Sequence, residues 1–310
     1  MMLSTAADTG PLSRIRLGTA PDSWGVWFPD DPNQVPWDRF LDQVAAAGYR
    51  WIELGPYGYL PTDPERLRDE LGRRGLRLSG GAVFSGLHRG REALEDAIQE
   101  CRAEAALLTA LGAKHLISLP EGYTDLDGKI TQPVDLTPGQ WKDLTSGMSE
   151  LARVLREETG VELVFHPHAD SHVDTQERVS RFLEDTDPEY VSLCLDTGHI
   201  SYCGGDNIEI IRAFPERIGY VHLKQVDPEI VRQVREEDLC FAEAVRRGAM
   251  IEPPTGIPDM EPLLAELGRL DADLFAIVEQ DLYPCPPDTP FPIATRTRKY
   301  FNGCGLGPRT

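Results

Sequence analysis

The sequence has little positive charge, no paired-cysteine motif and no long hydrophobic run. Its 310 residues carry 31 Lys and Arg against 51 Asp and Glu, a formal net charge of −20. A molecule of this charge repels the phosphate backbone, so we expect no nucleic-acid partner. None of the six cysteines forms a CxxC pair, which favours reduced thiols. Because no run approaches the roughly 20 residues of a membrane span and the start, MMLSTAADTGPLSR, lacks a hydrophobic signal core, we expect a cytoplasmic protein without a membrane partner.

The sequence does contain a regular alternation of short apolar runs and longer amphipathic segments. The apolar runs are rich in Val, Ile and Leu and predict strands at 15–20, 51–54, 76–82, 115–119, 162–165, 191–195, 218–223 and 275–279. The segments between them predict helices at 37–47, 63–74, 91–111, 139–158, 174–184 and 260–270. Eight such units predict an α/β fold, a single-domain (β/α)8 TIM barrel over 15–310 after a flexible N-terminal segment 1–14.

Two segments between predicted strands and helices are unusually long. They are 121–138, after the fourth strand, and 227–258, after the seventh. Both lie at the carboxyl ends of the strands, where barrel enzymes build their sites. Of the histidines outside the strand ends, His88 and His172 are assigned to loops or solvent, and His115 to the opposite end of the barrel.

Ligand-type side chains follow four of the predicted strands: His166 follows ELVF, Asp196 follows SLCL, His222 follows GYV, and Glu279 follows FAIV. In a closed parallel barrel these carboxyl ends converge on one mouth. Two imidazoles and two carboxylates suit Mn²⁺, Co²⁺ or Zn²⁺ better than Ca²⁺, and Mn²⁺ is the first choice. The structural alternatives are a hydrogen-bonded strand-end histidine, a helix N-cap or turn carboxylate, a core imidazole and an ion pair, respectively.

Five further side chains lie where a substrate would bind. His168 and Lys224 each follow a predicted ligand by two residues, which in an extended chain places them on its side. His168 is a candidate base or hydroxyl ligand, and Lys224 a candidate oxyanion stabiliser or acid, with a salt bridge as its alternative. His199 is a candidate substrate ligand or a helix-start histidine. Glu53 ends the second strand and Trp24 follows the first, and both would hold a sugar ring, with lid packing as the alternative for Trp24.

Three linked motifs carry a resemblance to a known family. They are FHPHADSHVDTQERVSRFLEDTDPEYVSLCLDTGHISYCGGD, YVHLKQV and VEQD. The chain resembles the xylose-isomerase-like TIM barrels, a superfamily of sugar isomerases, ketose 3-epimerases, inosose dehydratases and family-two apurinic endonucleases. Within it, the inosose (2-keto-myo-inositol) dehydratases look most similar. The resemblance implies that Asp196, His222 and Glu279 bind the metal and that the end of the fifth strand completes the set. Isomerases and epimerases of this superfamily have Glu at that position, where this chain has His166, so the symmetrical carboxylate pair of an epimerase lacks one member.

The resemblance and the residue types together predict a metal-dependent dehydratase. It would remove water from a polyhydroxylated cyclic ketone such as 2-keto-myo-inositol through an enediolate, with His166 or His168 as the base. The first alternative is a sugar or keto-sugar isomerase or epimerase with the same metal site. The others are an apurinic endonuclease, which the net charge opposes, and a sugar-binding barrel without turnover. The expected partner is a small polyol or keto-sugar, and a homo-oligomer packed through the rim segments and the aromatic tail 284–310 is a further expectation.

Overall fold

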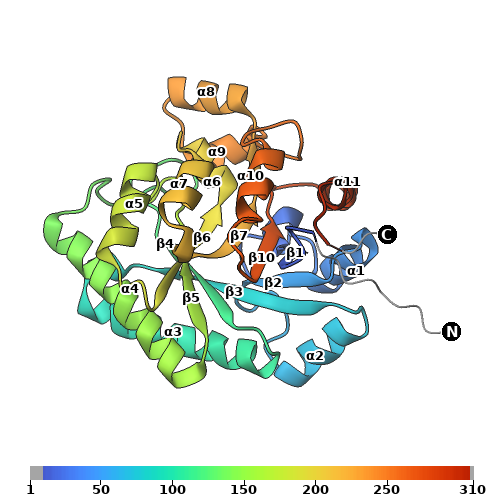
Figure 1. The fold of residues 1–310 in the computed structure, drawn as a ribbon, viewed down its shortest axis with the longest axis horizontal. Helices are drawn as coiled ribbons and strands as arrows, with labels where there is room; N and C mark the ends of the chain where they lie inside the picture. The colour runs from blue at the N-terminus through green and yellow to red at the C-terminus, as the bar shows by residue number, and fades with distance from the viewer. Residues whose placement is uncertain (1–9, 308–310) are drawn as a thin grey trace.

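Eight parallel strands form one closed barrel in the computed structural model, which describes residues 10–307. The order around the barrel is β1-β10-β7-β6-β5-β4-β3-β2 (Figure 1). The bounds are β1 Ile15–Thr19, β2 Trp51–Pro56, β3 Arg77–Ser85, β4 His115–Pro120, β5 Glu162–Phe165, β6 Val191–Asp196, β7 Ile218–Leu223 and β10 Leu274–Val278. All eight predicted strands are confirmed, with ends displaced by at most three residues. The predicted single-domain (β/α)8 TIM barrel is therefore confirmed.

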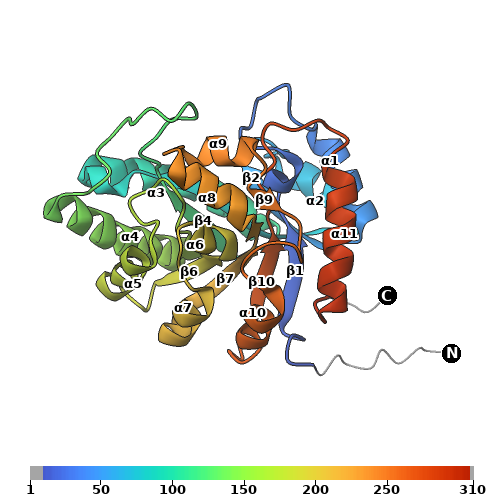
Figure 2. The same ribbon diagram turned by 90° about the horizontal axis from the view of Figure 1, so that it is seen from above.

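Helices surround the barrel on its outer side (Figures 1 and 2). They are α1 Trp37–Ala47, α2 Pro64–Gly72, α3 Arg91–Ala110, α4 Pro138–Thr159, α5 Gln176–Asp185, α6 Thr197–Tyr202, α7 Asn207–Ala213, α10 Met260–Leu267 and α11 Pro290–Gly303. The six predicted helices are confirmed, whereas α6, α7 and α11 were not predicted. All residues of α6 are buried, so it shows no amphipathic pattern. No helix within residues 10–307 combines the length and apolar character needed to cross a membrane.

The C-terminal tail packs within its own chain. In α11, Phe301 is buried and the Arg298 guanidinium donates a hydrogen bond to the carbonyl of Gly48, at the end of α1. The aromatic content of this tail is thus explained without a second copy, and a homo-oligomer stays a prediction. At the other terminus, residues 1–9 of the expected flexible segment lie outside the described residues, while Leu12 is buried in the core.

The two long segments lie at the same end of the barrel, where Figure 2 shows the connection between β4 and α4 on the same side as helices α8 and α9. The segment after β7 contains α8 Pro228–Glu236, α9 Phe241–Arg246 and a small antiparallel sheet of β8 Gln225–Val226 and β9 Met250–Ile251. Neither this sheet nor its helices were predicted. The two strands and α9 are too short for a clear periodicity, whereas α8 is amphipathic and begins with an Asp227 N-cap followed by Pro228, a signal that was overlooked. The predicted rim position is confirmed for both segments.

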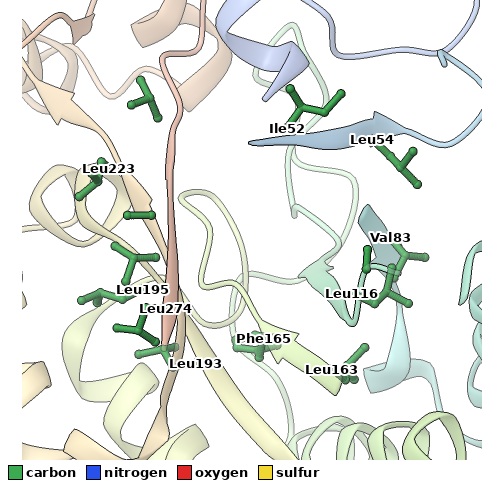
Figure 3. Packing of buried hydrophobic residues seen from close by; sticks show 14 of the residues in the cluster. Ile52, Leu54, Val83, Leu116, Leu163, Phe165, Leu193, Leu195, Leu223 and Leu274 are labelled. Atoms are coloured by element: carbon green, nitrogen blue, oxygen red, sulfur yellow. The ribbon is translucent and has the colours of Figure 1, made fainter. Parts of the chain in front are cut away.

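Alternation along the strands separates two cores. Residues such as Leu163, Leu193 and Leu195 face the helices and form the outer core (Figure 3). The positions between them face inward, and a smaller cluster that includes Ala20, Ile117, Val164, Cys194, Tyr220 and Ile277 fills the barrel. Both faces of a parallel sheet are therefore apolar, as expected for a barrel covered by helices. On β5, β6, β7 and β10 the next inward position beyond this cluster lies at the carboxyl end of the strand, and there the side chains become polar.

At the amino end of β7, Arg217 ties three elements together. Its guanidinium is buried and donates to the carbonyls of Val191 (3.0 Å) and Leu183 and to the hydroxyl of Thr186 (2.9 Å). The planar guanidinium group presents several N–H donors and can reach three acceptors at once. A lysine ammonium at the same position is a point charge and cannot replace all three hydrogen bonds.

We predict that Arg217→Lys lowers the free energy of unfolding by about 2 kcal/mol, because buried acceptors lose their donors. Urea denaturation measures this directly. The control is Arg212→Lys, which alters an exposed ion pair with Glu266 and should cost less than about 1 kcal/mol. Equal losses in the two variants would contradict the assigned role of the Arg217 guanidinium.

Candidate metal centre and substrate cavity

Four side chains predicted from strand ends meet at the mouth of the barrel. One ligand atom from each of His166, Asp196, His222 and Glu279 lies within 4.8 Å of all the others. Each residue is the next inward position after a residue of the inner core, on β5, β6, β7 and β10 respectively. An ion about 2.1 Å from each donor needs donors no more than about 4.2 Å apart. The four atoms are therefore close to the spacing that a bound divalent ion requires.

The orientation of His222 supports this interpretation. Its Nε2 lies 2.9 Å from a carboxylate oxygen of Glu53, so Nε2–H donates there and Nδ1 is the remaining ring nitrogen. Nδ1 is buried, has no hydrogen-bond partner in residues 10–307 and lies 2.8 Å from Glu279 Oε2. Two acceptors at this distance repel each other unless a proton or a cation lies between them. A carboxylate that orients the far nitrogen of a histidine is a common companion of metal ligation.

Asp196 uses its two carboxylate oxygens differently. Oδ1 accepts a hydrogen bond from the backbone N–H of His199 (2.8 Å) and caps the N-terminus of α6. Oδ2 faces the cluster, 3.3 Å from His166 Nε2 and 3.7 Å from His222 Nδ1. The structural alternative for this residue, a helix cap, is therefore present together with the cluster position, since one oxygen serves each.

Lys224 brings a fixed positive charge to the same carboxylates. Its Nζ lies 3.1 Å from Asp196 Oδ2, 3.3 Å from Glu279 Oε2 and 2.8 Å from Asp281 Oδ2, and its side chain is 2% exposed. The stem of the lysine passes over Gly198, where a Cβ would lie 2.7 Å from Lys224 Cβ. Glycine at this position of the LDTGH motif therefore makes room for the lysine.

These charges control the ionisation of the centre. Burial opposes the ionisation of Asp196, but Lys224 and then the neighbouring histidines outweigh it and hold its pKa well below the ordinary range. Burial opposes the ionisation of Glu279 too, yet His222 and Lys224 lower its pKa to about 2. For Lys224 itself, burial favours the neutral amine, but the carboxylates outweigh it and raise the pKa. At neutral pH the centre thus presents ionised carboxylates beside a charged lysine.

His168 and His199 form a second pair of imidazoles beside the cluster, with ring centroids 4.0 Å apart. His168 Nδ1 lies 2.7 Å from the carbonyl of Ala169, so Nδ1 carries the hydrogen and Nε2 has a free lone pair. His199 Nδ1 accepts from the backbone N–H of Ala169 (3.2 Å), so Nε2 carries the hydrogen of the neutral ring, and this Nε2 lies 3.4 Å from the Lys224 ammonium. Burial and then His166 lower the pKa of His168 to about 3. His168 therefore offers an acceptor and His199 a donor.

A cavity of about 780 Å³ opens over the centre and exceeds the size needed for a sugar-sized ligand. Its floor includes Glu53, Lys224 and the two further imidazoles, as predicted for substrate-contacting positions. Trp24 is the exception, since its ring is fully buried edge-on against Phe40 and its Nε1–H donates to Gln43. It does not line the cavity, so the expectation that it holds a sugar ring gives way to the packing alternative. Aromatic side chains that do line the cavity are Trp27, Phe28, Tyr57, Phe84 and Phe241.

Three buried carboxyl groups of the cavity were missed from the sequence. Asp281 lies two residues beyond Glu279, and Asp22 two residues beyond the inner-core residue Ala20, so the two-residue spacing that identified His168 and Lys224 could have found both. The third is Glu104 on α3, which is 3% exposed and occupies the space left by the missing side chain of Gly81. A glutamate on the apolar face of a predicted helix was its only signal.

Fold and cluster together define a parallel (β/α)8 barrel with a candidate metal centre at the carboxyl ends of its strands. The family model of the xylose isomerase-like TIM barrels matches residues 41–296, and the chain belongs to this family. An inosose dehydratase from Geobacillus kaustophilus is 33% identical over 297 residues, which span 93% of this chain and 94% of that protein.

Solved structures agree with the fold. A probable 3-DHS dehydratase from Bacillus anthracis superimposes with a TM-score of 0.68 at 15% identity, covering 93% of this chain and 98% of that one. The IolI protein, described with a bound zinc atom, superimposes with a TM-score of 0.66 at 18% identity and covers 93% and 96% of the two chains. At these identities the likeness establishes the barrel architecture alone.

We predict that Glu53→Gln weakens binding of a divalent ion by roughly 10- to 100-fold, because a neutral amide no longer raises the basicity of His222. Isothermal titration of the metal-free protein with Mn²⁺ gives the affinity. Glu104→Gln is the matched control, since Glu104 lies in the same cavity wall without contacting the four candidate ligands. An unchanged Mn²⁺ affinity in Glu53→Gln would show that the Glu53 carboxylate does not support metal binding through His222.

Glu104 generates a prediction about pH. Burial, opposed by a hydrogen bond from the Ala82 backbone and reinforced by Glu53, raises the pKa of Glu104 from 4.5 to about 8. The folded state keeps this proton up to about pH 8, whereas the unfolded chain releases it near 4.5, so the free energy of unfolding falls across that interval. Glu104→Gln removes this pH-dependent loss of stability. The difference in Tm between the variant and the wild type should therefore rise by several degrees from pH 5 to pH 8, in favour of the variant.

Calorimetric scans at the two pH values measure the difference. Glu100→Gln, an exposed change on the same helix α3, is the control and should give the same Tm difference at both. A pH-independent difference for Glu104→Gln would contradict a buried, protonated carboxyl group.

Proposed function

We propose that this protein is a metal-dependent dehydratase, a lyase that removes water from a polyhydroxylated cyclic ketone such as 2-keto-myo-inositol. The observation that carries the proposal is the convergence of His166, Asp196, His222 and Glu279 beneath a cavity of suitable size. The inosose dehydratase from Geobacillus kaustophilus, similar along almost the whole chain, supports the choice of substrate. The substrate is a small polyol or keto-sugar.

The donor set fits a borderline divalent ion, and we propose Mn²⁺ first, with Co²⁺ or Zn²⁺ as alternatives. When bound, such an ion acts as a Lewis acid that polarises a ketone oxygen and makes the neighbouring C–H more acidic. His166 belongs to the ligand set in this assignment, because its Nε2 faces Asp196 Oδ2 at 3.3 Å. Of the two candidate bases, this leaves His168.

The residues around the centre divide the remaining tasks. His168 accepts the proton from the carbon beside the ketone through its free Nε2, and the Nε2–H of His199 donates to a substrate hydroxyl. Lys224 stabilises negative charge on the substrate and donates a proton to the departing hydroxyl group. Its three carboxylate neighbours hold the ammonium in place before the substrate arrives. Glu53 keeps His222 in the orientation that ligation requires.

The second candidate is isomerisation or epimerisation of another keto-sugar with the same centre. It would share the abstraction of a proton next to the carbonyl and differ in returning the proton to carbon. The residue at the end of β5 argues against it, because His166 replaces the carboxylate that would complete a symmetrical pair across the carbon. Dehydration needs no such symmetry.

We predict that the purified, Mn²⁺-loaded protein forms a dione from 2-keto-myo-inositol, followed by ultraviolet absorbance, and that chelation abolishes the signal. His168→Asn should lower kcat at least about 100-fold while the bound metal, measured by elemental analysis, stays unchanged. Asp196→Ala should lose both metal and turnover. Bound metal without dione formation would exclude the dehydratase, and incorporation of solvent-derived deuterium into the recovered keto-sugar would then favour the isomerase or epimerase.

A further inference from the structure

The HPHADSH motif contains a residue that the proposed reaction does not use. Asp170 has a φ of +56°, a left-handed conformation that costs energy for a residue other than glycine. One of its oxygens, Oδ2, accepts two hydrogen bonds, from the backbone N–H of Phe241 (2.7 Å) and from the hydroxyl of Thr124 (3.2 Å). Both donors lie far away in the sequence. The strained backbone thus directs one oxygen at two distant segments.

The two donors belong to the two long rim segments, one after β4 and one after β7. Thr124 lies between β4 and α4, and Phe241 begins α9 in the segment after β7. All three residues line the cavity. Asp170 follows β5, so its carboxylate connects loops of three different strands at the cavity wall. The backbone carbonyl of Asp170 adds a further bond from the N–H of Tyr123 (2.8 Å).

Phe241 contacts the second pair of imidazoles. Its ring centroid lies 5.1 Å from that of His168 and 4.8 Å from that of His199. The aromatic ring therefore packs against both imidazoles and restricts their rotation. Since the N–H of Phe241 donates to Asp170, the position of this ring depends on the carboxylate.

The far part of the β4–α4 segment is held by other contacts. His172 Nε2 lies 2.9 Å from the carbonyl of Pro133, and His88 Nε2 lies 2.9 Å from the side-chain oxygen of Gln132. These two histidines were assigned to loops or solvent. Both are buried under the rim segment, so solvent is wrong for them, whereas His172 does lie in a loop. A direct bond between the two rim segments runs from the Arg246 guanidinium to the carbonyl of Leu126 (2.8 Å), and the contacts of Asp170 add a second link, beside the imidazoles.

We propose that Asp170 is a positioning residue that joins the two rim segments across the cavity and holds Phe241 against the imidazoles of His168 and His199. The carboxylate acts through Phe241 and does not touch the candidate ligands. Loss of the shared acceptor releases two donors at once and frees the start of α9. The imidazoles then lose a packing partner while the metal cluster below stays intact.

Three substitutions isolate the acceptor. Asp170→Ala removes it. Asp170→Asn keeps a side-chain oxygen and tolerates the positive φ. Asp238→Ala places the same alanine at another positive φ (+53°) within the segment after β7, where the aspartate side chain is exposed. It therefore controls for backbone strain.

Hydrogen exchange of the Phe241 amide, in the full chain loaded with Mn²⁺, gives the first result. We expect exchange at least about tenfold faster in Asp170→Ala and close to the wild type in both other variants. Thr124→Val, which removes one donor alone, should speed exchange between residues 122 and 131. Equal rates in Asp170→Ala and Asp238→Ala, or fast exchange in Asp170→Asn, would overturn the proposal.

Steady-state kinetics give the second result, which rests on the proposed dehydratase activity. Asp170→Ala should raise KM for 2-keto-myo-inositol about tenfold with unchanged metal content, and Asp170→Asn should restore it. A wild-type protein without dione formation would refute the proposed function, and hydrogen exchange would still decide the role of Asp170. A normal KM in an Asp170→Ala protein whose Phe241 amide exchanges fast would contradict the link to substrate binding.

Discussion

The structure depends on the accommodation of buried negative charge at the mouth of the barrel. Asp196, Glu279 and Asp281 meet there almost without solvent, and carboxylates in such a place need positive partners. Lys224 supplies one charge to all three. Because His222 directs a nitrogen at the same oxygens, the arrangement requires either a proton on that nitrogen or a cation shared between imidazoles and carboxylates. The strands of the barrel hold these groups together.

The short segment 166–172 after β5 connects this centre with the two rim segments above the cavity. His166 faces the carboxylates, His168 faces the cavity, Asp170 holds two rim segments and His172 holds one of them again. Alternate residues of this one loop thus lie at the carboxylate cluster, the cavity and the rim. The backbone of this single loop therefore couples the carboxylate cluster to the rim segments that enclose the cavity. The position of the rim segments thus follows that of the cluster.

Sequence periodicity predicted the strands and the cluster because both depend on the alternation of inward-facing and outward-facing side chains along a strand, which repeats every two residues. In β5, β6, β7 and β10 the inward position after the last core residue is the ligand-type residue, as with Val164 and His166 or Cys194 and Asp196. Of the two alternatives for Trp24, packing holds and the sugar-ring contact does not, because residues 21–24 form a short 3-10 helix that turns the ring toward Phe40. Glu104 was missed because the sequence pattern of a helix predicts which face is buried. It does not predict which residues of the neighbouring strand that face will contact. Of the rim helices, α9 has no local signal of comparable strength, whereas α8 begins with an Asp-Pro pair as α2 does and was overlooked.

The most direct test of the account is a crystal structure of the Mn²⁺-loaded protein with anomalous data collected to locate the ion. We expect one ion about 2.1 Å from donor atoms of His166, Asp196, His222 and Glu279. The donor atom of His222 should be Nδ1. We also expect that Lys224 turns toward Asp281 as the ion takes over two of its carboxylates. A well-ordered centre without an anomalous peak, in which Lys224 alone neutralises the carboxylates, would contradict the central claim.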